Sequence, residues 1–140
     1  MDKIRILKII ILRVFVAVLY LFIGGTCALQ GIRIAEAGTA AQIPQLEGDG
    51  GGNFLYGDLI VIAGILFIFK PRLAAPLILL SSLLGMLVSL IYQDEQLIRI
   101  SMMSLISGCV ILLSPLLTRV IHAAIKKAAS MKRPKITQIL

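Results

Sequence analysis

The sequence predicts an all-α, polytopic membrane protein, in which four transmembrane helices form a bundle and a basic amphipathic helix follows at the C-terminus. Hydrophobic residues make up 59% of the 140 residues and charged residues only 15%, and the mean hydropathy is +0.99. This composition is too apolar for a soluble domain of this length. The charged residues also lie in clusters between long apolar runs. We therefore expect one membrane domain, residues 1–140, surrounded by lipid.

The first predicted span covers residues 9–29 and is interrupted only by Arg13. About 20 residues that rise about 1.5 Å each cross a hydrocarbon core of about 30 Å. A cleaved signal peptide is the alternative, because basic residues precede this run and residues 35–37 have the A-x-A form of a cleavage site. The apolar run is longer than that of a signal peptide, which favours the span.

Residues 30–53 are predicted to form an extracytoplasmic loop, because small and polar residues are mixed there and three glycines stand together at residues 50–52. A phosphate-binding loop would need a lysine after the glycines, and a calcium loop would need oxygen ligands at fixed offsets. Neither pattern is present. The glycine run is therefore interpreted as flexible chain that leads into the second helix, and no metal ligand set is expected.

Three further spans are predicted from the remaining apolar runs, at residues 54–69, 73–92 and 100–117. Pro71, which stands between two basic residues, ends the second run because proline cannot continue a helix. The polar residues 93–96 separate the third run from the fourth. We expect a bend at Pro115, within the fourth span.

The distribution of charge predicts the orientation. Basic residues precede the first span, lie between the second and third, and follow the fourth, whereas acidic residues lie in the other two connections. The positive-inside rule then places both termini in the cytoplasm and the protein in a bacterial inner membrane. If residues 54–69 did not cross the membrane, the basic tail would lie on the opposite side. We attribute the net charge of +7 to orientation and lipid contact, and we expect no nucleic-acid partner.

The basic tail, residues 118–140, contains apolar residues at helical spacing beside lysines. This pattern predicts an amphipathic helix on a surface of anionic lipid. An unstructured basic tail is the alternative. The residues expected at the lipid surface are Arg119, Lys126, Lys127, Lys132 and Arg133.

Small residues recur at every fourth position of the third and fourth spans. In lipid, such faces allow the backbones of two helices to approach closely. They predict either that these two helices pack against each other or that one of them faces a partner subunit, and chance recurrence is the alternative. The residues concerned are Ser81, Gly85 and Ser89, and Ser104 and Gly108.

Asp58 is the main candidate for a functional side chain, because it lies at the start of the predicted second span. An ionisable group within the membrane is costly unless it is paired or hydrated, and this marks Asp58, with its neighbour Tyr56, as a candidate site. A helix N-terminus also favours a carboxylate, so a capping role is the alternative. The expected partners of Asp58 are Arg33 and Arg99, which stand near the outer ends of spans.

Arg13 is the second charged residue predicted within a span, and it is therefore also a candidate functional residue. The alternative is that its side chain only extends to the cytoplasmic headgroups.

Cys27 and Cys109 are predicted at different depths, too far apart for a disulfide, so each is expected to be a small packing residue. The sequence contains no HExxH motif, no histidine-rich cluster and no Ser/His/Asp set. The chain is therefore not expected to be a catalyst on its own, and no cofactor is evident.

Two segments resemble a known family. The segment LRVFVAVLYLFIGG has Arg13 near its start and Phe22 before two glycines, and YGDLIVIAGILFIFKPRLAAPLILL contains Asp58 and Arg72. With these features, residues 12–117 resemble the DoxX-like family of small four-helix membrane proteins, although that family generally has glutamate at the position of Asp58 and a lysine after the first helix. Its members are linked to quinone-associated sulfur oxidation or to redox-stress complexes. The resemblance implies contact with a quinone and makes Asp58 and Arg72 the conspicuous positions.

The expected function is that of a small integral-membrane accessory subunit of a bacterial membrane complex, associated with redox chemistry and a quinone pool. Its expected partners are the lipid bilayer and either other membrane subunits or further copies of itself. Two other functions stay open. One is a self-assembling pore of the holin type, and the other is a small carrier or immunity-type binding protein with Asp58 in its cavity.

Overall fold

The computed structural model describes residues 2–131, and it contains four helices. All four are long and apolar enough to cross a membrane, and residues 2–131 contain no strand. The prediction of an all-α protein with four transmembrane helices is confirmed. The helices are α1 (Asp2–Ala41), α2 (Pro44–Phe69), α3 (Pro71–Tyr92) and α4 (Glu95–Met131).

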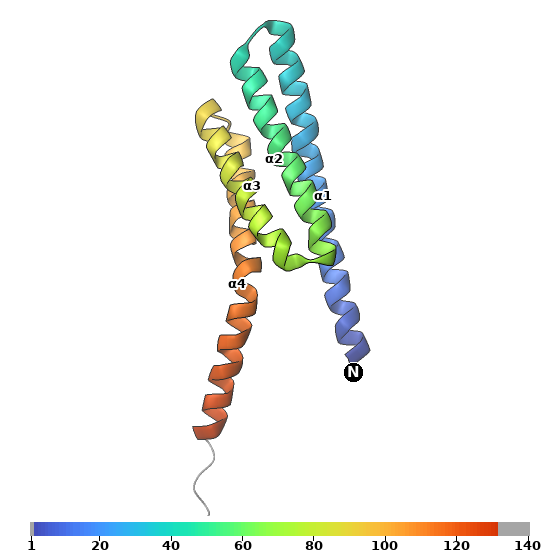
Figure 1. Cartoon of the computed structure of the whole chain (residues 1–140), viewed down its shortest axis with the longest axis vertical. Coiled ribbons are helices and arrows are strands. Elements are labelled where there is room, and N and C mark those ends of the chain that lie inside the picture. Colours follow the sequence, from blue (N-terminus) through green and yellow to red (C-terminus); the bar gives the residue numbers. More distant parts are fainter. Residues whose placement is uncertain (1, 132–140) are drawn as a thin grey trace, which may run out of the picture.

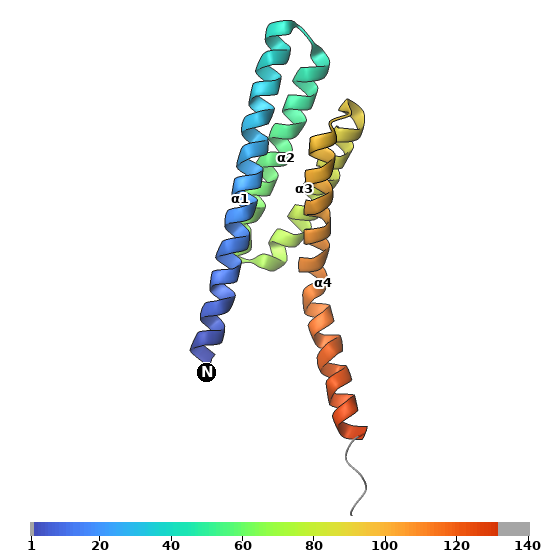
Figure 2. The same ribbon diagram turned by 180° about the vertical axis from the view of Figure 1, so that it is seen from behind.

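The helices pack in chain order, α1 on α2, α2 on α3 and α3 on α4. The α1–α2 hairpin reaches beyond the α3–α4 connection at one end of the bundle (Figure 1). At the other end, the beginning of α1 and the end of α4 both extend past the α2–α3 connection, as the reverse view also shows (Figure 2). Both helix ends therefore lie on the same side, which we call the inner end, and the α1–α2 connection lies at the outer end.

The prediction of a loop at residues 30–53 is wrong, because nearly all of this segment is helical. α1 continues to Ala41 and α2 begins at Pro44, so only Gln42 and Ile43 connect them. Gln42 turns the chain with a positive φ of 54°. Pro44 suits the first position of a helix, where no backbone N–H is needed.

The glycines taken for flexible chain instead form a contact between α1 and α2, which we call the glycine seam. A methyl group on Gly50 would lie 2.5 Å from the carbonyl oxygen of Gly31, and one on Gly57 would lie 2.5 Å from that of Gly24. Only glycine permits such close approach of two backbones. The seam repeats every seven residues on both helices, at Gly24, Gly31 and Gly38 on α1 and at Gly50, Gly57 and Gly64 on α2.

The contact between α3 and α4 uses the predicted small residues. Ser81, Ser89 and Ser104 are buried. A methyl group on Gly85 would overlap the Ser101 hydroxyl of α4, and one on Gly108 would meet Ile78 of α3. Gly85 and Gly108 therefore lie where α3 and α4 approach each other.

α4 continues without interruption through Pro115 to Met131, so the helical tail is an extension of the fourth helix. Proline leaves the carbonyl group four residues earlier, that of Ile111, without its N–H partner. The hydroxyl group of Ser114 donates to this carbonyl oxygen at 2.9 Å. Hydroxyl side chains commonly satisfy such groups in membrane helices, and this explains how the proline is tolerated.

Candidate functional site

A groove of about 550 Å³ lies between α1 and α4. Its lining is mostly aliphatic and aromatic, with Phe22 on α1 and Met103 on α4 among the wall residues. Tyr20, Ser104 and Ser107 supply hydroxyl groups to the same groove. An apolar groove with a few polar groups is suited to a ligand that is itself largely apolar.

A hydrogen bond across the groove joins α1 to α4. The hydroxyl groups of Tyr20 and Ser107 lie 2.5 Å apart. Ser107 donates its hydrogen to the carbonyl oxygen of Ser104 at 2.9 Å, and a serine hydroxyl has only one hydrogen to give. Tyr20 is therefore the donor to Ser107, and its own oxygen can accept a hydrogen bond from a ligand.

Tyr56, one of the predicted candidates, lies in the core. It is fully buried, and its hydroxyl group lies 2.7 Å from that of Ser104. The buried hydroxyl of Ser101 has no hydrogen-bond partner among the described residues. Tyr56 thus joins α2 to α4 within the protein and does not form a site beside Asp58.

Asp58 lies far inside α2, so the capping alternative is wrong: the N-terminus of α2 is Pro44. Asp58 is exposed, on the helix face that also exposes Leu55, Ile62 and Ile65. This face points away from α1 and α3, and Asp58 does not line the α1–α4 groove. In the single chain, Asp58 therefore lies on an exposed helix face and outside the α1–α4 groove.

The depth of Asp58 follows from its place in α2. Asp49 lines the same pocket as the α3–α4 connection, and Phe69 ends α2. At about 1.5 Å per residue, Asp58 lies about 13 Å from the level of Asp49 and about 16 Å from that of Phe69. These two levels are about 30 Å apart, which is the thickness of a hydrocarbon core, and Asp58 lies about midway between them.

The expected arginine partners do not reach Asp58. Arg99 pairs with Glu95 on its own helix at 3.4 Å, and this is the one ion pair among the described side chains. Both members of that pair are highly exposed, so it contributes little to stability. Arg33 is exposed on α1. The Asp58 carboxylate therefore has no counter-charge within the described part of the chain.

Two of the predicted arginines come together at the inner end. Arg13 of α1 and Arg72 of α3 line one cavity of about 430 Å³, and Pro115 of α4 completes it. Arg72 also lines a neighbouring cavity of about 250 Å³, together with Arg119. α1, α3 and α4 thus each contribute one arginine to these two adjoining cavities, and we call Arg13, Arg72 and Arg119 the arginine cluster.

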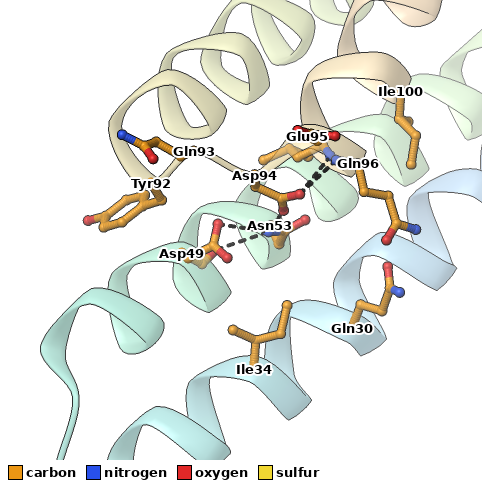
Figure 3. A pocket seen from close by; sticks show the side chains of 11 residues that line it. Gln30, Ile34, Asp49, Asn53, Tyr92, Gln93, Asp94, Glu95, Gln96 and Ile100 are labelled. Carbon is orange, nitrogen blue, oxygen red and sulfur yellow. Dashed lines mark hydrogen bonds between the residues drawn. The ribbon is translucent and has the colours of Figure 1, made fainter.

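A polar pocket of about 540 Å³ lies at the outer end, between the α1–α2 hairpin and the α3–α4 connection. Figure 3 shows the side chains of Asp49 and Asp94 directed toward that of Asn53. The amide nitrogen of Asn53 donates to Asp49 at 3.2 Å and to Asp94 at 3.1 Å. Asp94 also accepts from the backbone N–H groups of Gln96 and Leu97 at 2.9 and 3.1 Å, and so caps α4.

The outer pocket is therefore a structural junction. One amide group separates two carboxylates that would otherwise repel each other. No group of three or more metal-ligating side chains is present within the part of the chain searched. Sequence reasoning missed this junction, although an aspartate directly before an apolar run, as Asp94 is, indicates a helix N-cap.

The remaining predicted residues are the two cysteines and the basic residues of the tail, of which Arg119 belongs to the arginine cluster. Cys27 is buried and Cys109 exposed, and both are free thiols. Arg119 and Lys126 are exposed on α4. The side chain of Lys127 and all of Lys132 and Arg133 lie outside the described residues.

No protein-family model, curated protein or solved structure matches the chain. Its function is therefore inferred from the groove, from Asp58 and from the charges of its own helices.

Proposed function

We propose that the chain is a small integral-membrane accessory subunit of a bacterial membrane complex. The observation that carries this proposal is Asp58, an exposed carboxylate near the middle of an apolar helix face. An aspartate at the centre of a membrane helix is disfavoured by about 2.5–3.5 kcal/mol on insertion scales. A basic side chain from a helix of another subunit offsets this cost, whereas lipid does not.

We propose that the protein lies in the inner membrane with both of its termini on the cytoplasmic side. α1 is 40 residues long, so it extends about 60 Å and passes beyond a core of about 30 Å at both ends. Its inner extension carries Lys3, Arg5 and Lys8, and Arg119 and Lys126 lie on the inner extension of α4. An excess of basic residues marks the cytoplasmic side.

The association with redox chemistry rests on the α1–α4 groove and on the resemblance to the DoxX-like family. The groove offers apolar walls for a lipid-soluble ring or chain, and Tyr20 offers an oxygen that accepts a hydrogen bond. A quinol donates hydrogen bonds, so its hydroxyl group matches this acceptor. We therefore propose a quinol-type molecule as the ligand of the groove.

A pore or a carrier has less support. The exposed face of α1 carries large apolar side chains, such as Phe15, Val18 and Phe22, and no continuous polar stripe runs along its described length. A pore formed by this face would lack a polar lining. A carrier with Asp58 in its own cavity has less support because Asp58 is exposed on the outer face of α2.

Co-purification in mild detergent tests the subunit proposal. We expect a stoichiometric membrane partner with the wild-type chain, and we expect Asp58→Asn to reduce its yield about tenfold, which corresponds to about 1.4 kcal/mol. Glu36→Gln is the matched control, because it removes an exposed carboxylate at the outer end of α1. Full retention of the partner by Asp58→Asn would contradict the proposal, as would homo-oligomers without any partner. Unchanged helicity and elution volume of the variant show that its fold is intact.

A further inference from the structure

The arginine cluster at the inner end is the strongest site that the proposed function leaves unused. Arg13, Arg72 and Arg119 belong to three different helices, and they line two adjoining cavities of about 430 and 250 Å³. The two cavities share Arg72, Ile111 and Pro115. A ligand at this point therefore contacts α1, α3 and α4 at once.

Among the described side chains, no acidic group balances the charge of the arginine cluster. The acidic side chains that the structure describes lie at the outer end, except Asp58, which points outward from the middle of α2. The described ion pairs include none of the three arginines. Three positive side chains line these adjoining cavities, so their charge favours the binding of an anion there.

The geometry of the arginine side chain favours a phosphate group as that anion. A guanidinium group presents its donors in a planar fork that binds two phosphate oxygens at once. Lipid phosphates also occur at this depth, because Arg72 follows directly on the α2–α3 connection at the inner membrane boundary. Basic pockets between membrane helices on the cytoplasmic side are typical binding sites for anionic lipid headgroups.

The rest of the cavity fits the lipid chain. Leu12, Phe67 and Val110 are among the apolar residues that line the 430 Å³ cavity. Val16 lines both this cavity and the α1–α4 groove, so the two are neighbours along α1. An acyl chain attached to a phosphate at the arginines can follow this path toward the middle of the membrane.

We propose that the inner end of the bundle binds one anionic phospholipid, with its phosphate on Arg13, Arg72 and Arg119 and an acyl chain beside Val16. A free phosphate ion would use only the arginines. The apolar walls and the opening between membrane helices favour the lipid over the ion. This site does not depend on the partner proposed for Asp58 or on a ligand of the α1–α4 groove.

Native mass spectrometry of the full chain, purified from vesicles of phosphatidylcholine and phosphatidylglycerol, tests the proposal. We expect one phosphatidylglycerol molecule to remain bound to the wild-type chain. The double variant Arg13→Gln/Arg72→Gln is expected to lower the bound fraction at least tenfold. Arg33→Gln/Arg99→Gln is the matched control, since it removes the same charge at the opposite end and is expected to retain the lipid. Equal retention by both double variants would overturn the proposal.

Two further measurements identify the ligand and need no variant. Phosphatidylcholine with the same acyl chains is expected to bind at least tenfold less, and equal binding would show that the arginines do not select an anion. Inorganic phosphate at millimolar concentration is expected not to displace the lipid, and full displacement would show that phosphate alone is recognised. Thermal unfolding in detergent gives an independent check, because phosphatidylglycerol should raise the midpoint by several degrees more than phosphatidylcholine. An equal effect of the two lipids would contradict the proposal.

Discussion

At the scale of single residues, Asn53 is the side chain whose replacement should be most informative about stability. Its amide group stands between the carboxylates of Asp49 and Asp94, and Asp94 in turn caps α4. A buried donor that serves two charged acceptors contributes more than an ordinary hydrogen bond, about 1.5–3 kcal/mol. Asn53 therefore ties the α1–α2 hairpin to the start of α4.

We expect Asn53→Ala to lower the free energy of unfolding by about 1.5–3 kcal/mol, because the two carboxylates would face each other without a donor between them. The measurement is unfolding in detergent, followed by circular dichroism. Gln45→Ala is the control, since Gln45 is an exposed amide on the same helix. A similar small change in the free energy of unfolding of both variants would mean that the junction does not stabilise the protein.

Asp58 also shows which property of a residue cannot be predicted from the sequence. The sequence indicates that a lone carboxylate in an apolar segment is unusual, but it does not indicate on which face of the helix the Asp58 side chain lies. The apolar run predicts that α2 begins at residue 54, which would put Asp58 in its first turn, whereas α2 begins at Pro44. The face on which a side chain lies depends on its neighbours in the fold, and local composition does not supply these.

At the scale of elements, the glycine seam decides how α1 and α2 pack. Neighbouring glycines in α2 differ sharply in their surroundings. A methyl group on Gly50 would collide with the α1 backbone at Gly31, whereas one on Gly51 would meet nothing within 4 Å. The same substitution should therefore have different effects on stability at these two adjacent positions.

We expect Gly50→Ala to destabilise the protein, because the two helices must separate to admit the methyl group. Gly51→Ala is expected to be neutral or to stabilise it by up to about 1 kcal/mol, since alanine is the better helix former. Midpoints of thermal unfolding of the two variants in the same detergent make the comparison. Equal midpoints would show that α1 and α2 do not touch at Gly50.

The four helices and their order could be predicted from apolar runs and prolines, because these reflect the thickness of the bilayer. The loop at residues 30–53 could not, because glycine was judged by its flexibility. In a membrane, glycine is also the residue that lets helices touch. The seven-residue spacing from Gly24 to Gly38 is the feature of the sequence that indicates a helix contact of this kind. The α1–α4 groove depends on how the two hairpins diverge, and no local pattern in the sequence encodes that.

At the scale of the whole molecule, the arrangement of the helix ends predicts the topology. The beginning of α1 and the end of α4 extend from the same end of the bundle (Figures 1 and 2). The α1–α2 connection at Gln42 lies at the opposite end. An even number of crossings requires the two termini to share a compartment.

Cysteine labelling in whole cells tests this topology. In a background of Cys27→Ala and Cys109→Ala, we expect Gln42→Cys to react with a membrane-impermeant maleimide in intact cells. Lys3→Cys and Lys126→Cys are expected to react only after lysis. Labelling of either of these two in intact cells would place the termini outside the cytoplasm.

The glycine seam has one more consequence, which concerns the alignment of its two helices. Because the glycines repeat every seven residues on both α1 and α2, moving one helix by seven residues, about 10 Å, would again bring glycines face to face. Gly31 would then oppose Gly57, and Gly24 would oppose Gly64. The seam alone therefore permits two alignments of the hairpin. The short connection at Gln42 and the hydrogen bond from Tyr20 to Ser107 select the observed one.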